Sequence, residues 1–141
     1  MMYTAQEVAR YVVNKCATEG HPISNLQLQK ILYFLQVGSI RAGHGIAFGD
    51  EMEAWQFGPV VPNVYYQYGR YGAMPITDTY QNESILSEDQ KVLDPIIEEK
   101  RVLDAWDLVE ESHREGGPWS RNYGGTGTHR PIPLTDIEQY G

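Results

Sequence analysis

The chain has 141 residues, and its 11 Lys and Arg against 19 Asp and Glu give a formal net charge of −8. This length predicts a single domain over residues 1–141 that is large enough to bury a core. A surface this acidic repels phosphate backbones, so the composition disfavours direct nucleic-acid binding and suits either solubility or a basic protein partner.

The cysteine content and the N-terminus indicate a cytoplasmic protein. Cys16 stands alone, which excludes an intrachain disulfide and a cysteine-based zinc site and fits a reducing compartment. Residues 1–10, MMYTAQEVAR, lack the apolar run of a signal peptide. No stretch approaches the ~20 apolar residues that span a membrane. We therefore expect a cytoplasmic location and no membrane partner.

Two helices with clear start signals open the chain. Thr4 with Glu7 and Ser24 with Gln27 are capping boxes, in which the hydroxyl accepts from a free backbone N–H and the longer side chain bonds back to the cap. Each box precedes apolar residues at helical spacing, namely Val8, Tyr11, Val12 and Cys16, then Leu28, Ile31, Leu32 and Leu35. The two apolar stripes predict helices that pack on each other.

The middle of the chain, EAWQFGPVVPNVYYQYGRYG over residues 53–72, holds many aromatic side chains and few reactive ones. Before it, the helical period is lost, and a hairpin around residues 46–57 that turns at Gly49-Asp50 is plausible. Gly58-Pro59 predicts a turn, and Pro62 suits the first position of a helix that runs to about Tyr71. On that helix an inward face is predicted for Val61, Val64, Tyr65 and Tyr68, and an outward one for Tyr66 and Arg70.

The second half predicts further helices joined by polar loops. Ser87 with Gln90 forms a third capping box, and Pro95 is expected to kink or restart the helix that follows. Asp104 can cap the next helix, on which Trp106, Val109 and His113 share one side. The Gly- and Pro-rich tail is predicted to be irregular, with a short final helix near Thr135. The expected fold is therefore mainly all-α, a compact bundle of about five to six helices with one candidate hairpin.

Catalytic and metal-binding patterns are scarce. No two of the four histidines stand three or four residues apart, and the glycine run at residues 124–127 lacks the Lys and Ser or Thr of a phosphate-binding loop. We therefore predict no metal and no cofactor. For His113 the favoured interpretation is structural: a hydrogen bond to a backbone carbonyl would lock the loop at Pro118-Trp119 against the bundle.

Three blocks of the sequence together resemble the SocA-like antitoxin domain, also called Panacea, which is often carried by prophages as a phage-associated protein. The blocks are SNLQLQKILY at residues 24–33, then Phe48 with EAW and GPVVPNVYYQYGRYG up to residue 72, and finally Leu108, Ser112-His113 and Pro118-Trp119. Phe57 stands where the family usually has Tyr, and Ser112 where it usually has Thr. The resemblance spans nearly the whole chain.

The resemblance implies a protein-binding module that neutralises a cognate toxin by direct contact, without catalysis. It also suggests a protease system as a further partner, because one relative is thought to deliver its toxin to a protease. Aromatic and arginine side chains are enriched at the centres of interfaces. The predicted partner-binding residues are therefore Phe57, Gly58, Pro59, Tyr66, Arg70 and Tyr71. The residues predicted to hold the fold together are Trp55, Tyr65, Tyr68, Trp106, His113, Pro118 and Trp119.

Two alternatives stay open at the level of the sequence. One is a small enzyme that uses His113, Glu53 and Glu110 near the GGPW segment at residues 116–119. The other is a phage factor with the same fold that binds a different protein of the host.

Overall fold

A computed structural model describes residues 1–81 and 84–141, which form seven α-helices and a three-stranded sheet. The elements are α1 (Ala5–Thr18), α2 (Asn25–Arg41), β1 (Met52–Trp55), β2 (Gly58–Val60), α3 (Pro62–Gln67), the 3-10 turn η1 (Gly69–Tyr71), α4 (Ser87–Lys100), α5 (Ala105–Ser112), α6 (Pro118–Asn122), β3 (Arg130–Ile132) and α7 (Leu134–Tyr140). The predicted mainly helical class is confirmed, and α6, in the tail predicted to be irregular, adds to the expected helices.

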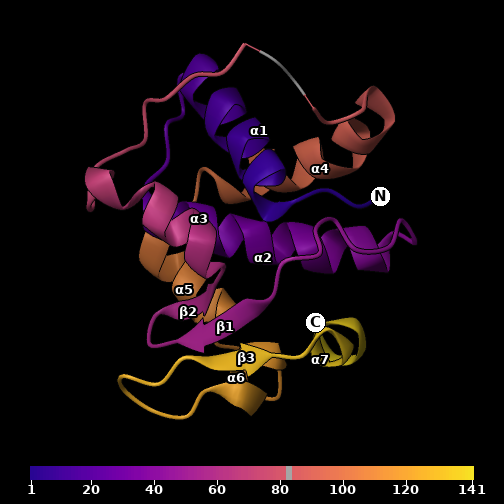
Figure 1. Cartoon of the computed structure of the whole chain (residues 1–141), viewed down its shortest axis with the longest axis vertical. Helices are drawn as coiled ribbons and strands as arrows, with labels where there is room; N and C mark the ends of the chain where they lie inside the picture. Colours follow the sequence, from indigo (N-terminus) through magenta and orange to yellow (C-terminus); the bar gives the residue numbers. More distant parts are fainter. Residues whose placement is uncertain (82–83) are drawn as a thin grey trace.

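Helix α2 lies in the middle of the molecule (Figure 1). Helices α1 and α4 cover one side of it, and the sheet with α6 and α7 lies on the other. Because neighbours surround α2, its polar residues are buried together with its apolar ones, and the buried polar set is Asn25, Gln29, Lys30, Gln36 and Ser39. A buried polar group is stable only with hydrogen-bond partners, so these side chains must bond to the elements that pack around α2.

The helix starts follow the sequence signals in all but one case. Both capping boxes, at Thr4 and Ser24, are formed in full, and the carboxylate of Asp104 accepts from the backbone N–H of Trp106 at 2.8 Å. The third box is wrong. Leu86 is the N-cap of α4, no side chain caps it, and Ser87 is already helical. Pro95 lies inside α4, which continues through it to Lys100 instead of restarting.

The hairpin exists, but its turn lies later than predicted. Strand β1 pairs antiparallel with β2, from Glu53 opposite Val60 to Trp55 opposite Gly58, so the turn falls at Gln56-Phe57 and not at Gly49-Asp50. Gly58 therefore belongs to a strand rather than to a turn. Its φ is +110°, and a Cβ there would lie 2.5 Å from Cε of Lys30 and 2.7 Å from Oγ of Ser112. Only glycine allows this conformation and this close approach.

The third strand comes from the C-terminal part of the chain. Strand β3 pairs antiparallel with the other edge of β1, with Met52 opposite Ile132 and Ala54 opposite Arg130. The sheet order is thus β2-β1-β3. The sequence analysis did not predict β3, because its three residues carry no alternating pattern and gain their pairing from a strand far away along the chain.

Helix α3 ends at Gln67, not near Tyr71, and the 3-10 turn η1 follows it. The predicted neighbours Tyr66 and Arg70 are therefore not one turn apart on a common helix. Tyr68, at the junction, is 1% exposed, and its hydroxyl lies 2.9 Å from that of Tyr80. In the part of the chain that the structure describes, no helix is both long and apolar enough to cross a bilayer.

Candidate functional site

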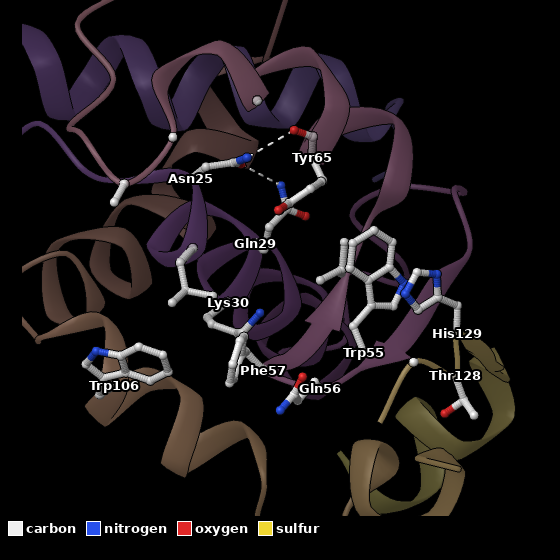
Figure 2. A pocket seen from close by; sticks show the side chains of 16 residues that line it. Asn25, Gln29, Lys30, Trp55, Gln56, Phe57, Tyr65, Trp106, Thr128 and His129 are labelled. Atoms are coloured by element: carbon white, nitrogen blue, oxygen red, sulfur yellow. Dashed lines mark hydrogen bonds between the residues drawn. The ribbon is translucent and has the colours of Figure 1, made fainter. Parts of the chain in front are cut away.

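A pocket of about 480 Å³ lies between the start of α2, the hairpin, α3 and the segment before β3. In Figure 2, Trp55 and His129 lie together on one side and Trp106 on the other, with Lys30 and Phe57 between them. We call this the aromatic pocket, after the five rings among its lining residues, which are Trp55, Phe57, Tyr65, Trp106 and His129.

Ring contacts hold each side of the aromatic pocket in place. Trp55 stacks on His129 with ring centroids 4.0 Å apart and meets the edge of Tyr65 at 5.1 Å. Its indole N–H donates to a carboxylate oxygen of Glu53 at 2.9 Å. On the other side, Phe57 and Trp106 form an edge-to-face pair at 5.3 Å. The side chains of the Phe57 and Trp106 pair nevertheless remain exposed, at 46% and 57%.

Lys30 is a buried cation in the wall of the aromatic pocket. It has no exposed surface, and its Nζ donates to the backbone carbonyl of Pro59 at 3.0 Å. Burial lowers the pKa of the Lys30 ammonium from 10.5 to about 7. Among the described residues no carboxylate lies within ion-pair distance of Lys30, so the bond to Pro59 offsets only part of the lost hydration.

Two buried amides beside Lys30 join α2 to the hairpin and to α3. The Gln29 carbonyl accepts from the backbone N–H of Val61 at 2.9 Å, and its amide donates to Asn25 at 3.0 Å. Asn25 in turn donates to the backbone carbonyl of Tyr65, and Figure 2 shows these last two bonds as dashed lines. Together with Lys30, they fix the backbone of residues 59–65 against α2. This network explains why polar residues occupy the buried face of α2.

Behind the hairpin, His113 and Trp119 stack with centroids 3.5 Å apart. The indole N–H of Trp119 donates to the backbone carbonyl of Trp55 at 2.7 Å, which links α6 to β1. His113 was predicted to hydrogen-bond a carbonyl, and this is wrong for Nε2, which is buried and has no partner among the described residues. Burial first, and then the charge of Lys30, lower the pKa of the His113 imidazole.

The predicted partner-binding residues divide by exposure. Phe57 lies at the hairpin turn and Tyr66 on α3, where 68% of it is exposed. The predicted role of Gly58 and Pro59 in partner binding stays a prediction, but both residues are buried in β2. The physical reason is the network above, which draws the backbone of β2 against α2.

Arg70 and Tyr71 bond to their own loop. The guanidinium of Arg70 forms an ion pair with Asp78 and lies over the ring of Tyr71, 4.8 Å from its centroid. The Tyr71 hydroxyl donates to the same carboxylate group at 2.6 Å. Asp78 therefore holds both side chains against the loop. Arg70 and Tyr66 therefore do not form one surface on a shared helix.

The residues predicted to hold the fold together also divide. Tyr68 and Pro118 are buried, Trp55, Tyr65, His113 and Trp119 are half-buried, and Trp106 is exposed. The predicted packing of Trp106 is wrong because Leu108 and Val109 supply the buried face of α5. Trp55 packs against Tyr65 of α3 and against His129 in the segment before β3.

The sequence analysis missed the polar wall of the aromatic pocket, formed by Asn25, Gln29 and Lys30, and it missed His129. A signal for the first three was present. They stand among the apolar residues of this helix or one turn before them, where a polar side chain is buried only with specific partners. For His129 no such signal existed, because its position depends on the pairing of β3 with β1.

The candidate catalytic groups are not joined into one site. Glu53 accepts from Trp55, while Glu110 is exposed on α5. Within residues 1–81 and 84–141 no hydrogen bond or ion pair connects either carboxylate to His113. A general base needs such a partner or a substrate within hydrogen-bond reach.

Comparisons with known proteins agree on one family. A model of the antitoxin SocA-like, Panacea domain matches residues 28–120, a range that includes the hairpin, α3, α5 and the start of α6. The chain is 34% identical over 150 residues to antitoxin SocA of Caulobacter vibrioides (strain NA1000 / CB15N). That alignment covers 92% of this chain and 76% of the relative. No solved structure matches significantly.

Proposed function

The chain belongs to the SocA-like antitoxin family, and we propose that it neutralises a toxin encoded beside it by direct protein contact through the aromatic pocket. The observation that carries the proposal is the Phe57 and Trp106 pair, whose two large rings stay 46% and 57% exposed beside a pocket of about 480 Å³. Tyr66, whose ring lies 6.2 Å from that of Trp55, extends the aromatic surface.

Exposed rings of this kind suit a protein interface. Tryptophan, tyrosine and phenylalanine bury a large area with few rotatable bonds, and they are enriched where binding energy concentrates. The pocket beside them is a concave site that can receive a side chain of the partner. Binding of this type requires no proton transfer, and the acidic surface disfavours nucleic acid, so the proposed partner is a protein in the cytoplasm.

The test is a rescue experiment with the double variant Phe57→Ala and Trp106→Ala. Because both side chains are exposed, we expect the free energy of unfolding to fall by only ~1 kcal/mol. Loss of both anchors should weaken toxin binding by at least ~2 kcal/mol, about thirtyfold. When this variant is co-expressed with the toxin from the neighbouring gene, it should fail to restore growth. Calorimetry should give a correspondingly weaker Kd for the toxin.

The matched control is the double variant Met2→Ala and Leu86→Ala. It removes two side chains that are as exposed, at 70% and 60%, and that do not line the aromatic pocket. We expect it to rescue growth like the unaltered chain. Full rescue and an unchanged Kd for the Phe57 and Trp106 variant would contradict the proposal and move the contact surface elsewhere.

A further inference from the structure

Negative charges predominate near Trp106. Helix α5 and its cap carry four carboxylates, of which Asp104 caps the helix and Glu111 pairs with Lys100 at 3.2 Å. The other two, Asp107 and Glu110, are exposed. Among the described residues neither has a hydrogen-bond or ion-pair partner on its side chain. Two free negative charges therefore share a short helix with Trp106.

Nearby positive charges do not balance these two. Lys30 is the cation of the pocket lining, but it has no exposed surface and donates to the carbonyl of Pro59. Arg114 keeps its charge, but it follows the end of α5, about two helical turns from Trp106, and donates to the backbone carbonyl of Tyr140 in α7. The charge that a partner meets at the α5 side of the aromatic pocket is therefore negative, in keeping with the net charge of −8.

The rings at this side are open to a cation. An edge-to-face pair leaves at least one face of each ring uncovered by the other ring, and Phe57 and Trp106 form such a pair with planes 84° apart. A cation near a tryptophan face is attracted by the electron-rich face of the ring, and nearby carboxylates strengthen the attraction. An apolar group can enter the pocket beside them.

We propose that the α5 side of the aromatic pocket binds an apolar or aromatic side chain of the toxin that is flanked by Lys or Arg. The proposal rests on the proposed function and adds the chemistry of the partner. The apolar group fills the space between Trp106 and the hairpin, while the flanking cation lies near Asp107 and Glu110. An acidic segment that reaches Lys30 is the opposite arrangement, and it would have to displace side chains that cover this buried amine.

Two small probes with the same ring and opposite charge test the proposal. Tryptamine carries an ammonium and indole-3-acetate a carboxylate, and each is titrated into the full 15N-labelled chain by NMR. We expect both to shift the signals of Gln56, Phe57 and the Trp106 indole N–H. Tryptamine should bind about fivefold more tightly at low salt, and added salt should reduce the difference.

Charge-neutral variants identify the source of the preference. Asp107→Asn with Glu110→Gln should abolish the preference for tryptamine. Glu51→Gln with Glu138→Gln changes the net charge equally at exposed positions outside the pocket lining and should keep it. Equal or tighter binding of indole-3-acetate, no shift at these residues with either probe, or a preference that survives in the Asp107 and Glu110 variant would each overturn the proposal.

The rescue experiment separates this inference from the proposed function. Suppose that the Phe57 and Trp106 variant fails to rescue growth, while the Asp107 and Glu110 variant rescues growth and binds the toxin fully. The aromatic contact then stands, and the proposed Lys or Arg of the toxin beside it is wrong. If the Phe57 and Trp106 variant rescues fully, the proposed function fails at this surface, whatever the probes show.

Discussion

The two ends of α2 use buried polar side chains in different ways. Near its C-terminal end, Gln36 accepts from the backbone N–H groups of Ala47 and Phe48 and donates to the carbonyl of Phe48, all between 2.7 and 3.3 Å. Near its N-terminal end, Lys30 has three donor hydrogens and one bond, to Pro59, beside an open pocket. We call the first the bonded end, because the amide of Gln36 makes hydrogen bonds through both its oxygen and its nitrogen. We call the second the pocket end, where the Lys30 ammonium makes a single hydrogen bond behind an exposed aromatic surface.

This difference shows how one helix can support both stability and binding. A fully bonded side chain fixes one arrangement of the loop it touches, because any other arrangement leaves buried groups unpaired. A buried ammonium with a single partner contributes less and is kept at a cost in hydration. We therefore expect the bonded end to tolerate change poorly and the pocket end to tolerate it well.

The largest expected effect is on stability and arises at the bonded end. Gln36→Leu leaves the two N–H groups and the carbonyl of residues 47 and 48 buried without partners. Each such group costs roughly 1–3 kcal/mol, so the free energy of unfolding should fall by at least ~3 kcal/mol in urea denaturation. The control Gln67→Leu changes an exposed glutamine and should have little effect. A loss below ~1 kcal/mol for Gln36→Leu would show that the loop finds other partners.

An intermediate effect on stability is expected at the pocket end, and it depends on pH. The pKa of Lys30 is lowered from 10.5 to about 7 in the folded protein. Between these values the unfolded chain holds one more proton than the folded chain, so this group makes stability rise with pH by ~1.4 kcal/mol per unit. Lys30→Met removes the contribution. The variant should therefore gain most in stability, relative to the unaltered chain, at pH 7 and below, and the gain should shrink towards pH 10.5.

Denaturation in urea at several pH values measures this difference. The matched control is Lys91→Met, which replaces an exposed lysine on α4 and should give a difference that does not vary with pH. The lost bond to Pro59 adds an offset that is independent of pH and leaves the slope intact. A difference for Lys30→Met that stays constant over the whole window would mean that Lys30 remains charged in the fold.

The smallest expected effect concerns His113, which lies behind the hairpin. Its Nε2 has no partner among the described residues, so His113→Asn loses mainly the stacking on Trp119, worth about 1 kcal/mol. Neutralisation by binding needs no proton transfer, so growth rescue should be unchanged. A variant that keeps its stability and its Kd for the toxin but no longer rescues growth would favour the enzyme alternative.

The sequence predicted what depends on neighbours in the chain. The caps at Thr4, Ser24 and Asp104 need only the next few residues, and all three form. Ser87 failed because Leu86 already takes the cap position, and a capping pattern does not fix its own register. The hairpin was expected in the right region, while its turn was misplaced because the fit of Gly58 against Lys30 is a contact between distant parts of the chain.

The candidate site was predictable to a similar degree. The aromatic block supplied Phe57 and Tyr66, both exposed, because surface and core positions of a short helix or turn can be told apart locally. Trp106 was misplaced because helical spacing gives the shared side of a helix but not where that side ends against its neighbours. Lys30 and His129 depend on which elements pack together, and that information lies outside any local pattern.

The stacking of His129 on Trp55 has a consequence for synthesis of the protein. Ribosomes add roughly 5–20 residues per second, so His129 is made several seconds after Trp55. During this interval the nascent chain already carries α2, the hairpin and α3, but it lacks the ring that stacks on Trp55 and the strand that pairs with β1. One side of the aromatic pocket therefore becomes complete only after His129 has been added. A chain cut short before residue 129 would contain most of the core residues but an unfinished pocket.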